Sequence, residues 1–356
     1  MRSIGLFVNK KTSNEPNDKS DNSDLMEIHI NLWNVRTKDG GDFYAIDFGL
    51  KYHKDVDAIK LVLPFEAEQD DFTDLAHVLT NNKSLLCTVF NADMSISSEQ
   101  SDSIHDVENQ DSNEKMAIYE LSARNIEWKP FDKDSNSTEL TIKPLYDKNH
   151  LKMDKVYVRF RIKLHHLNMF AHTRKLSNDL IQSAFSSTRL FDIRLNDKRE
   201  IDKKLIEGIM FDKYTMVKIE KMHFFYMADA EETLENGSNI PLGTRMLEKE
   251  RWNPYLGDRE MNDEYLAYHW KLKKQNTNPY PTFSVFFKTN YTSYDVRRIF
   301  KYSIIVILLS FLGSLIVSVF FPANENRIYG IGIIALFGFV AFCLILKSSY
   351  EDSARS

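Results

Sequence analysis

The sequence predicts a mainly β soluble domain, an antiparallel sandwich or barrel with few short helices, followed by a C-terminal transmembrane hairpin of two helices. Three observations predict this fold class. Short segments with alternating apolar and polar residues recur before residue 300, few helical segments separate them, and two uncharged apolar runs follow residue 300. Strands without crossover helices between them favour antiparallel pairing.

No regular structure is predicted for the N-terminal region. Residues 10–24 form a polar string without apolar periodicity, so we expect a flexible tail over residues 1–25. The following residues, 26–299, form the β-rich domain. Within it, residues 94–115 have the same polar character as the tail and predict a disordered loop or a boundary between two subdomains.

Alternation of apolar and polar residues predicts the strands of the domain. The clearest case is Lys155–Leu164, where alternate side chains predict one face in the core and one face in water. Two short helices are expected behind polar caps at 71–79 and 178–185. The other strands are expected at 43–52, 58–65, 85–90, 140–145, 190–195, 217–227, 266–272 and 283–287.

Two apolar runs predict a hairpin over residues 300–347. Residues 302–321 and 328–346 carry no charge, and as helices each would extend for ~30 Å, the thickness of the hydrocarbon core. The six residues between them allow only a tight turn, so both ends lie on one side. Basic residues flank the outer ends of the pair, which places both termini in the cytoplasm and 348–356 in a cytoplasmic tail. We expect a two-span protein of a bacterial inner membrane.

Small residues along the spans predict close helix packing. In the first span Ser310, Ser314 and Ser318 repeat at every fourth position beside Gly313. In the second span Gly338 has no side chain, which allows a neighbouring helix to approach closely. This face packs against the partner helix of the same hairpin, or it also mediates self-association into a ring or bundle. Neither span contains an ionisable residue, which argues against a proton relay.

Composition narrows the classes of function. The net charge is −5 and no basic run of nucleic-acid-binding type is present, which argues against nucleic acid as a partner. The two cysteines, Cys87 and Cys343, provide no disulfide framework or zinc motif. The first twenty residues lack the apolar core of a secretory signal. These features predict a domain that faces the cytosol.

No catalytic motif points to an enzyme. The soluble region has no phosphate-binding glycine loop and no GxSxG elbow. His165, His166 and His172 do not match standard zinc spacings, and the separate His29 and His223 are expected to serve packing. We therefore expect no catalytic residue, no cofactor and no metal.

One group of basic side chains is a candidate for an anionic ligand. Arg189, Arg194, Lys198 and Arg199 lie close together in the sequence and could bind a nucleotide, a peptide carboxylate or a lipid headgroup. A solvated strand edge explains the same group. The partners expected are therefore the lipid bilayer, a second copy of the chain through its spans, and a partner protein or small anionic ligand on the domain.

In layout the chain resembles the two-helix membrane effectors of bacterial anti-phage systems, such as those encoded beside retron reverse transcriptases or in cyclic-nucleotide signalling operons. The resemblance covers the arrangement of domain and hairpin, with no shared motif. It implies an effector whose domain senses a trigger and whose hairpin assembles in the membrane and perturbs it. The alternatives are a membrane-tethered scaffold that recruits a partner, and a tethered enzyme with an unusual site.

Overall fold

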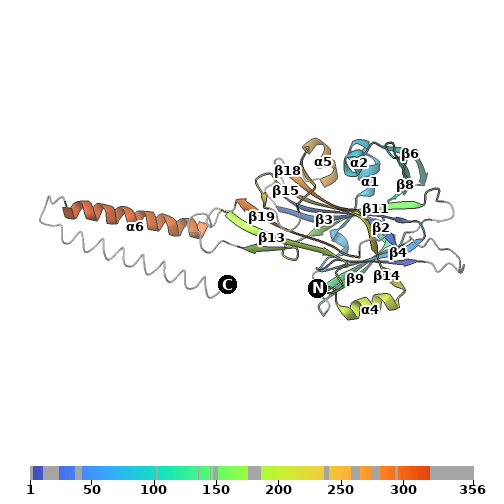
Figure 1. The fold of residues 1–356 in the computed structure, drawn as a ribbon, viewed down its shortest axis with the longest axis horizontal. Coiled ribbons are helices and arrows are strands. Elements are labelled where there is room, and N and C mark those ends of the chain that lie inside the picture. Colours follow the sequence, from blue (N-terminus) through green and yellow to red (C-terminus); the bar gives the residue numbers. More distant parts are fainter. Residues whose placement is uncertain are drawn as a thin grey trace. The chain divides into compact units, whose positions relative to one another are not determined.

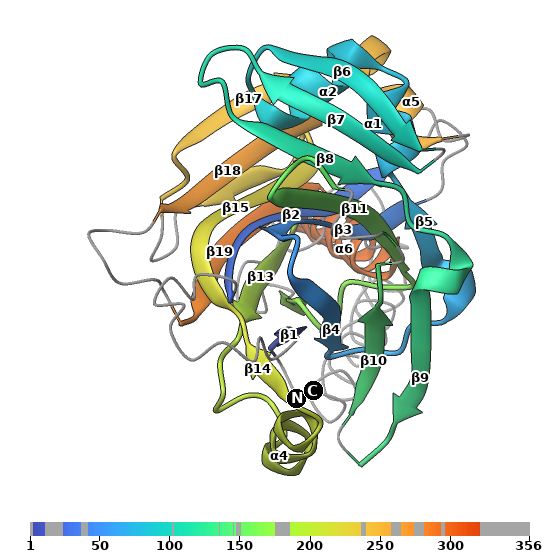
Figure 2. The same ribbon diagram turned by 90° about the vertical axis from the view of Figure 1, so that its right-hand side faces the viewer.

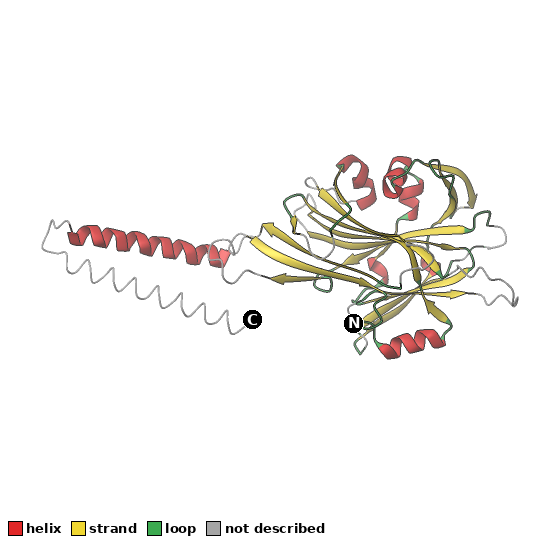
Figure 3. Cartoon of the chain, viewed as in Figure 1, coloured by secondary structure: helices red, strands yellow, loops and turns green. Residues whose placement is uncertain are grey.

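The part of the chain that the structure describes is mainly β, with three sheets and few helices (Figures 1 and 3). The computed structural model describes residues 3–10, 24–36, 42–101, 103–134, 136–144, 146, 151–174, 186–235, 240–257, 265–273, 281–292 and 296–320. The mainly β class predicted from the sequence is confirmed in this part of the chain.

The first sheet contains the N-terminal strand of the chain. Its strand order is β14-β1-β4-β10-β9, and β1 lies between β4 and β14 in antiparallel register. The prediction of a flexible tail over residues 1–25 is therefore wrong for β1, because Leu6 and Val8 enter the core. The strands are β1 Gly5–Lys10, β4 Val56–Leu63, β9 Ile126–Asp132, β10 Ser137–Ile142 and β14 Tyr214–Met216.

The second sheet is the largest and has the order β17-β18-β15-β2-β3-β11-β8-β7-β6, with β5 paired to β11. Most of its pairs are antiparallel as predicted, but β2 pairs with β15 and β8 with β11 in parallel. Its strands are β2 Leu25–Arg36, β3 Asp42–His53, β5 Phe72–Asp74, β6 Met94–Ser101, β7 Ile104–Asn109, β8 Lys115–Tyr119, β11 Lys155–Leu164, β15 Lys218–Asp229, β17 Gly243–Leu247 and β18 Tyr265–Lys273.

Apolar residues of these two sheets share one hydrophobic cluster. Ile28 and Phe48 of the second sheet and Leu6 and Leu61 of the first are each at most 1% exposed and belong to it. Burial of apolar side chains contributes ~25 cal/mol per Å² removed from water, so this shared cluster is the main source of stability.

The opposite face of the second sheet is also covered, by α1, α2 and α5 (Figure 2). The polar face expected to meet water is therefore buried in β11, where Arg159 is 1% exposed and Arg161 is 6% exposed. The helices are α1 Ala76–Thr80, α2 Lys83–Phe90, α4 Lys203–Phe211 and α5 Lys249–Leu256, with 3-10 turns at Gln69–Asp71 and Ala123–Asn125.

Three local predictions are corrected by the structure. Residues 85–90 form part of α2, because apolar residues at 85, 86, 89 and 90 follow helical spacing behind the cap of Asn82. The polar segment 94–115 contains the paired strands β6 and β7, held by backbone hydrogen bonds that do not depend on apolar side chains. The segment 71–79 contains strand β5 before the short helix α1, and the helix expected at 178–185 lies outside the described residues.

Two compact units are distinguished along the chain: Met1–Thr173 with Arg189–Thr289, and Arg174–Thr188 with Asn290–Ser356. The second unit contains α6, Val296–Phe320. Within the part of the chain that the structure describes, no helix combines the length and the apolar character that crossing a membrane requires. The second predicted span, 328–346, lies outside the described residues.

The third sheet has the order β12-β13-β19-β16. Its strands are β12 Ala171–Arg174, β13 Ser186–Leu195, β19 Phe283–Thr292 and β16 Thr233–Glu235.

Candidate functional site

The parallel pairing of β2 with β15 brings two polar segments of the chain side by side. Glu27 lies opposite Lys221, and His29 lies opposite His223. Alternate residues of a strand point to the same face of the sheet, so all four side chains share one face. These residues are separated by almost two hundred positions in the sequence.

The neighbouring strands add further polar side chains to this face. On one side, β3 pairs Lys51 with Glu27. On the other side, β18 places Lys271 beside His223 and places His269 beside Phe225. The result is a patch of imidazole, ammonium and carboxylate groups across four adjacent strands.

The histidines of this patch are connected through hydrogen bonds. His29 Nε2 lies 3.1 Å from Glu27 Oε1, and His223 Nδ1 lies 2.9 Å from His269 Nε2. The rings of His29 and His223 have centroids 5.0 Å apart, and Phe225 stacks on His269 at 4.2 Å. His223 Nε2 is buried without a hydrogen-bond partner among the described residues.

Lysine side chains surround the carboxylate of Glu27. Lys221 Nζ lies 2.7 Å from Glu27 Oε1, and Lys51 Nζ lies 3.7 Å from Oε2. Lys51 also contacts Glu114 at 2.5 Å. Lys271, which is exposed, makes no ion pair with any residue that the structure describes.

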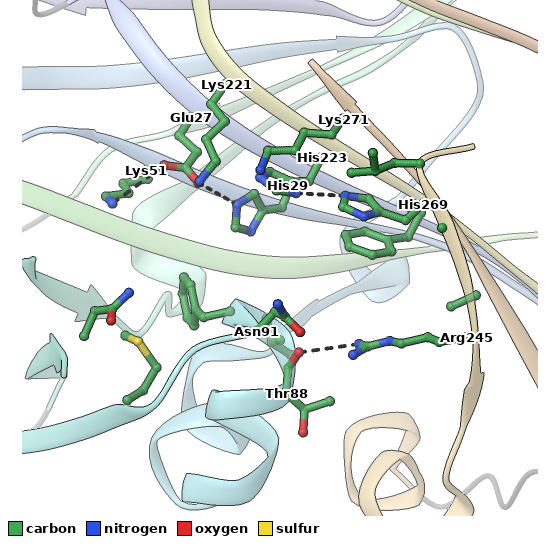
Figure 4. Close-up of a pocket in the computed structure, with 18 of the residues that line it drawn as sticks. Glu27, His29, Lys51, Thr88, Asn91, Lys221, His223, Arg245, His269 and Lys271 are labelled. Atoms are coloured by element: carbon green, nitrogen blue, oxygen red, sulfur yellow. Dashed lines mark hydrogen bonds and ion pairs between the residues drawn. The ribbon is translucent and has the colours of Figure 1, made fainter. Parts of the chain in front are cut away.

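A pocket of about 460 Å³ lies above this patch. Its opposite wall includes Thr88 of α2 and Asn91, which follows that helix, and Arg245 of β17 donates a hydrogen bond to the carbonyl oxygen of Thr88 at 3.5 Å. Figure 4 shows the imidazoles of His29, His223 and His269 along the sheet, across the pocket from α2. The lining contains four cationic side chains against two carboxylates: Lys51, Lys221, Lys271 and Arg245 against Glu27 and Glu114.

Burial determines the charge state of the three histidines. It lowers the pKa of His223 to about 2 and that of His269 to about 4, and it lowers the pKa of His29 as well. Burial alone would raise the pKa of Glu27, but the hydrogen bond with His29 and the nearby lysines lower it below its usual range. At neutral pH the three imidazoles of the patch are therefore neutral and Glu27 is a carboxylate.

Gly49 permits the close packing that supports His29. A Cβ atom at this position would lie 2.1 Å from the hydroxyl oxygen of Tyr157 and 3.0 Å from Arg159 Nη1. The Tyr157 hydroxyl lies 3.4 Å from His29 Nδ1 and accepts a hydrogen bond from Arg159 at 2.8 Å. The absence of a side chain at Gly49 therefore gives Tyr157 its place beside the histidine.

Two of the four basic residues predicted as a site for an anionic ligand, Arg194 and Arg199, are paired with carboxylates. Arg194 contacts Asp192 at 2.8 Å and Glu200 at 3.1 Å, and Arg199 contacts Asp197 at 3.0 Å. These ion pairs favour the explanation of a charge-balanced surface. The other two residues of the group, Arg189 and Lys198, differ in setting: Arg189 donates to the side-chain oxygen of Asn34 at 3.3 Å, and Lys198 is exposed.

The small residues predicted to pack the hairpin lie partly within α6. Ser310, Gly313 and Ser314 are exposed, and Ser310 Oγ donates to the carbonyl oxygen of Val306 at 3.0 Å. Ser318 belongs to the same helix, but its side chain is not described, and Gly338 lies outside the described residues. Their roles in packing or self-association stay predictions.

The site built on β2 and β15 was not predicted from the sequence. Glu27, His29 and Asn31 alternate with apolar residues, which indicates a strand with a polar face, but nothing in the sequence pairs this strand with β15. His29 and His223 therefore looked like separate packing residues. No known protein family matches the chain, and no curated protein matches its sequence.

Proposed function

We propose that this chain is a membrane-anchored effector whose β-rich domain is a sensor and whose C-terminal hairpin perturbs a membrane. The observation that carries the sensor role is the pocket over β18, β15, β2 and β3, which is large enough for a small molecule and contains converging polar groups. Its position on the rigid central strands of the sheet suits recognition of a ligand.

The pocket favours an anionic ligand that also has an apolar or aromatic part. Four cationic side chains against two carboxylates leave an excess of two positive charges in the lining. Figure 4 shows Lys271 beside the histidines and Arg245 across the pocket beside Thr88, and both can donate hydrogen bonds to an anionic group. Phe90 and Phe225 provide apolar surface beside them.

The membrane role is supported by the sequence of 302–346 and by the surface of α6. Val306 and Leu309 are each 61% exposed along this helix, and Leu312 is 52% exposed. A row of exposed apolar side chains is stabilised when a bilayer or another helix shields it from water. Only three residues connect the end of β19 at Thr292 to the start of α6 at Val296. In the sequence, the proposed membrane helix therefore follows the last strand of the β-rich domain almost directly.

In this proposal both termini face the cytoplasm of a bacterial cell, the hairpins self-associate, and the activity serves anti-phage defence. The layout that resembles two-helix defence effectors supports this setting. A membrane-tethered scaffold is the second candidate, because a pocketed domain on an inert anchor would share every feature described above.

Membrane depolarisation in bacterial cells distinguishes the two candidates. Overproduction of the full chain is expected to collapse the membrane potential, read with a voltage-sensitive dye, and to arrest growth. Leu312→Arg places a charge near the middle of the first span at a cost of ~3 kcal/mol, so it should abolish the effect, whereas the control Leu312→Phe should keep it. A full chain that accumulates in membranes without depolarising them would contradict the effector role and favour the scaffold.

A further inference from the structure

We propose that Glu27, His29 and His223 form a binding site for a divalent transition metal ion, with zinc as the best match. One ligand atom from each residue can be chosen so that all three lie within 4.8 Å of one another. Two imidazoles and a carboxylate are a ligand set that zinc binds with tetrahedral geometry, leaving its fourth position open. Magnesium and calcium prefer sites made of oxygen atoms alone.

The hydrogen bond between His223 and His269 prepares His223 as a ligand. If His269 donated this bond, His223 would carry its proton on Nε2, a buried donor without an acceptor among the described residues. The alternative tautomer, with Nδ1–H of His223 donating to His269 Nε2, leaves a lone pair on His223 Nε2. A buried lone pair is less costly than a buried N–H, and it is the group that binds a metal ion. His269 is thus the outer partner that orients the ligand.

The other two ligands need only a small rearrangement. His29 Nε2 and Glu27 Oε1 are 3.1 Å apart and share one proton. Metal binding at Nε2 uses the other neutral tautomer of His29, in which this proton has moved to Nδ1, so that Nε2 and Glu27 Oε1 both offer lone pairs to the ion and no net proton is released. The Tyr157 hydroxyl, 3.4 Å from His29 Nδ1, then accepts the hydrogen bond from the other nitrogen of the ring.

Lys221 competes with the metal ion for the same carboxylate. Its ammonium group lies 2.7 Å from Glu27 Oε1 and occupies the position of a cation beside it. Removal of this charge by Lys221→Met is expected to tighten metal binding by roughly tenfold or more, since neighbouring like charges repel strongly in a partly buried site. The comparison is Lys271→Met, which removes a like charge beside His223 without breaking an ion pair with Glu27 and should therefore tighten binding less than Lys221→Met does.

The test is a metal titration of the full chain in detergent after removal of metal with a chelator. Calorimetry with Zn²⁺ is expected to give one site per chain, and Co²⁺ is expected to give the visible absorption of a tetrahedral complex. His223→Asn should weaken binding by more than the ~10–100-fold that loss of an outer partner such as His269 causes. His53→Asn, which alters a histidine at the end of β3 beside Asp55, should have no effect.

The opposite effects of these variants keep the test independent of folding. A damaged fold could explain weaker binding by His223→Asn, but it could not explain tighter binding by Lys221→Met. The proposal would be overturned by a wild-type chain that binds no zinc, or by Zn²⁺ affinities equal in the wild type, His223→Asn and Lys221→Met. Because the titration needs no membrane activity, its outcome does not depend on the effector role.

Discussion

The carboxylate of Asp47 holds together a buried polar network in the second sheet, so its removal should strongly destabilise the fold. Arg161 donates to Asp47 Oδ1 at 2.7 Å and to Oδ2 at 3.0 Å, and Asp47 is 0% exposed. Trp33 Nε1 and the hydroxyl of Tyr255 also donate to Oδ2, at 2.6 and 2.9 Å. Asp47→Asn would leave a buried guanidinium without its counter-charge.

The size of the effect follows from the burial of both partners. Loss of one member of a buried ion pair costs ~3–5 kcal/mol, because the remaining charge stays away from water. For a domain of this size each kcal/mol lowers the melting temperature by ~2–4 °C, so Asp47→Asn should melt roughly 10 °C below the wild type. Thermal unfolding of the full chain in detergent, followed by near-ultraviolet circular dichroism, measures this shift.

A matched control is provided by an exposed ion pair. Lys54 Nζ and Asp154 Oδ1 are 2.8 Å apart, but the side chain of Asp154 is 72% exposed. Surface pairs of this kind contribute ~0–1 kcal/mol, so Asp154→Asn should melt within a few degrees of the wild type. If Asp47→Asn melted as Asp154→Asn does, the reasoning about the buried network would be refuted.

Three further variants test single features of the fold. Gly49→Ala should lower the free energy of unfolding, measured by chemical denaturation, by ~1–3 kcal/mol because its Cβ meets the Tyr157 hydroxyl. Adding Tyr157→Phe to this variant should recover part of the loss. Equal stability of the single and the double variant would contradict this packing. Burial raises the pKa of Glu232, so its contribution to stability is present at low pH and lost as pH rises through the native pKa. Glu232→Gln should therefore gain stability relative to the wild type as pH rises above 4.5, the ordinary pKa of a glutamate carboxyl, and a difference that stays constant with pH would exclude this linkage. Asp202→Ala removes the cap that accepts from Leu205 N at 2.9 Å and should lower the free energy of unfolding by ~1 kcal/mol, whereas an unchanged melting temperature would argue against the cap.

The strands were predictable where alternation was strong. The predicted strand Lys155–Leu164 coincides with β11, and the segment 43–52 lies within β3, Asp42–His53. Apolar and polar residues alternate with a period of two within each segment, so the local sequence is enough to recognise the strand. The long strand β2 was missed because its buried polar residues His29, Asn31 and Asn34 weaken the apolar signal.

The partners of the strands could not be predicted in the same way. Residues 94–109 read as a polar loop, yet Met94 and Val107 are buried beneath the helices that cover the second sheet. Backbone pairing with neighbouring strands overrides weak local preference. The candidate site depends on such pairing most of all, because the parallel alignment of β2 and β15 alone brings His29 beside His223.

The proposed effector role depends on insertion of the residues after 300 into lipid. Flotation of lysed cells on a density gradient, followed by an alkaline carbonate wash, tests this insertion directly. We expect the full chain to float with the membranes, to resist the wash and to be released only by detergent. Recovery of the full chain in the supernatant after high-speed centrifugation without detergent would contradict the proposed anchor and, with it, the effector role.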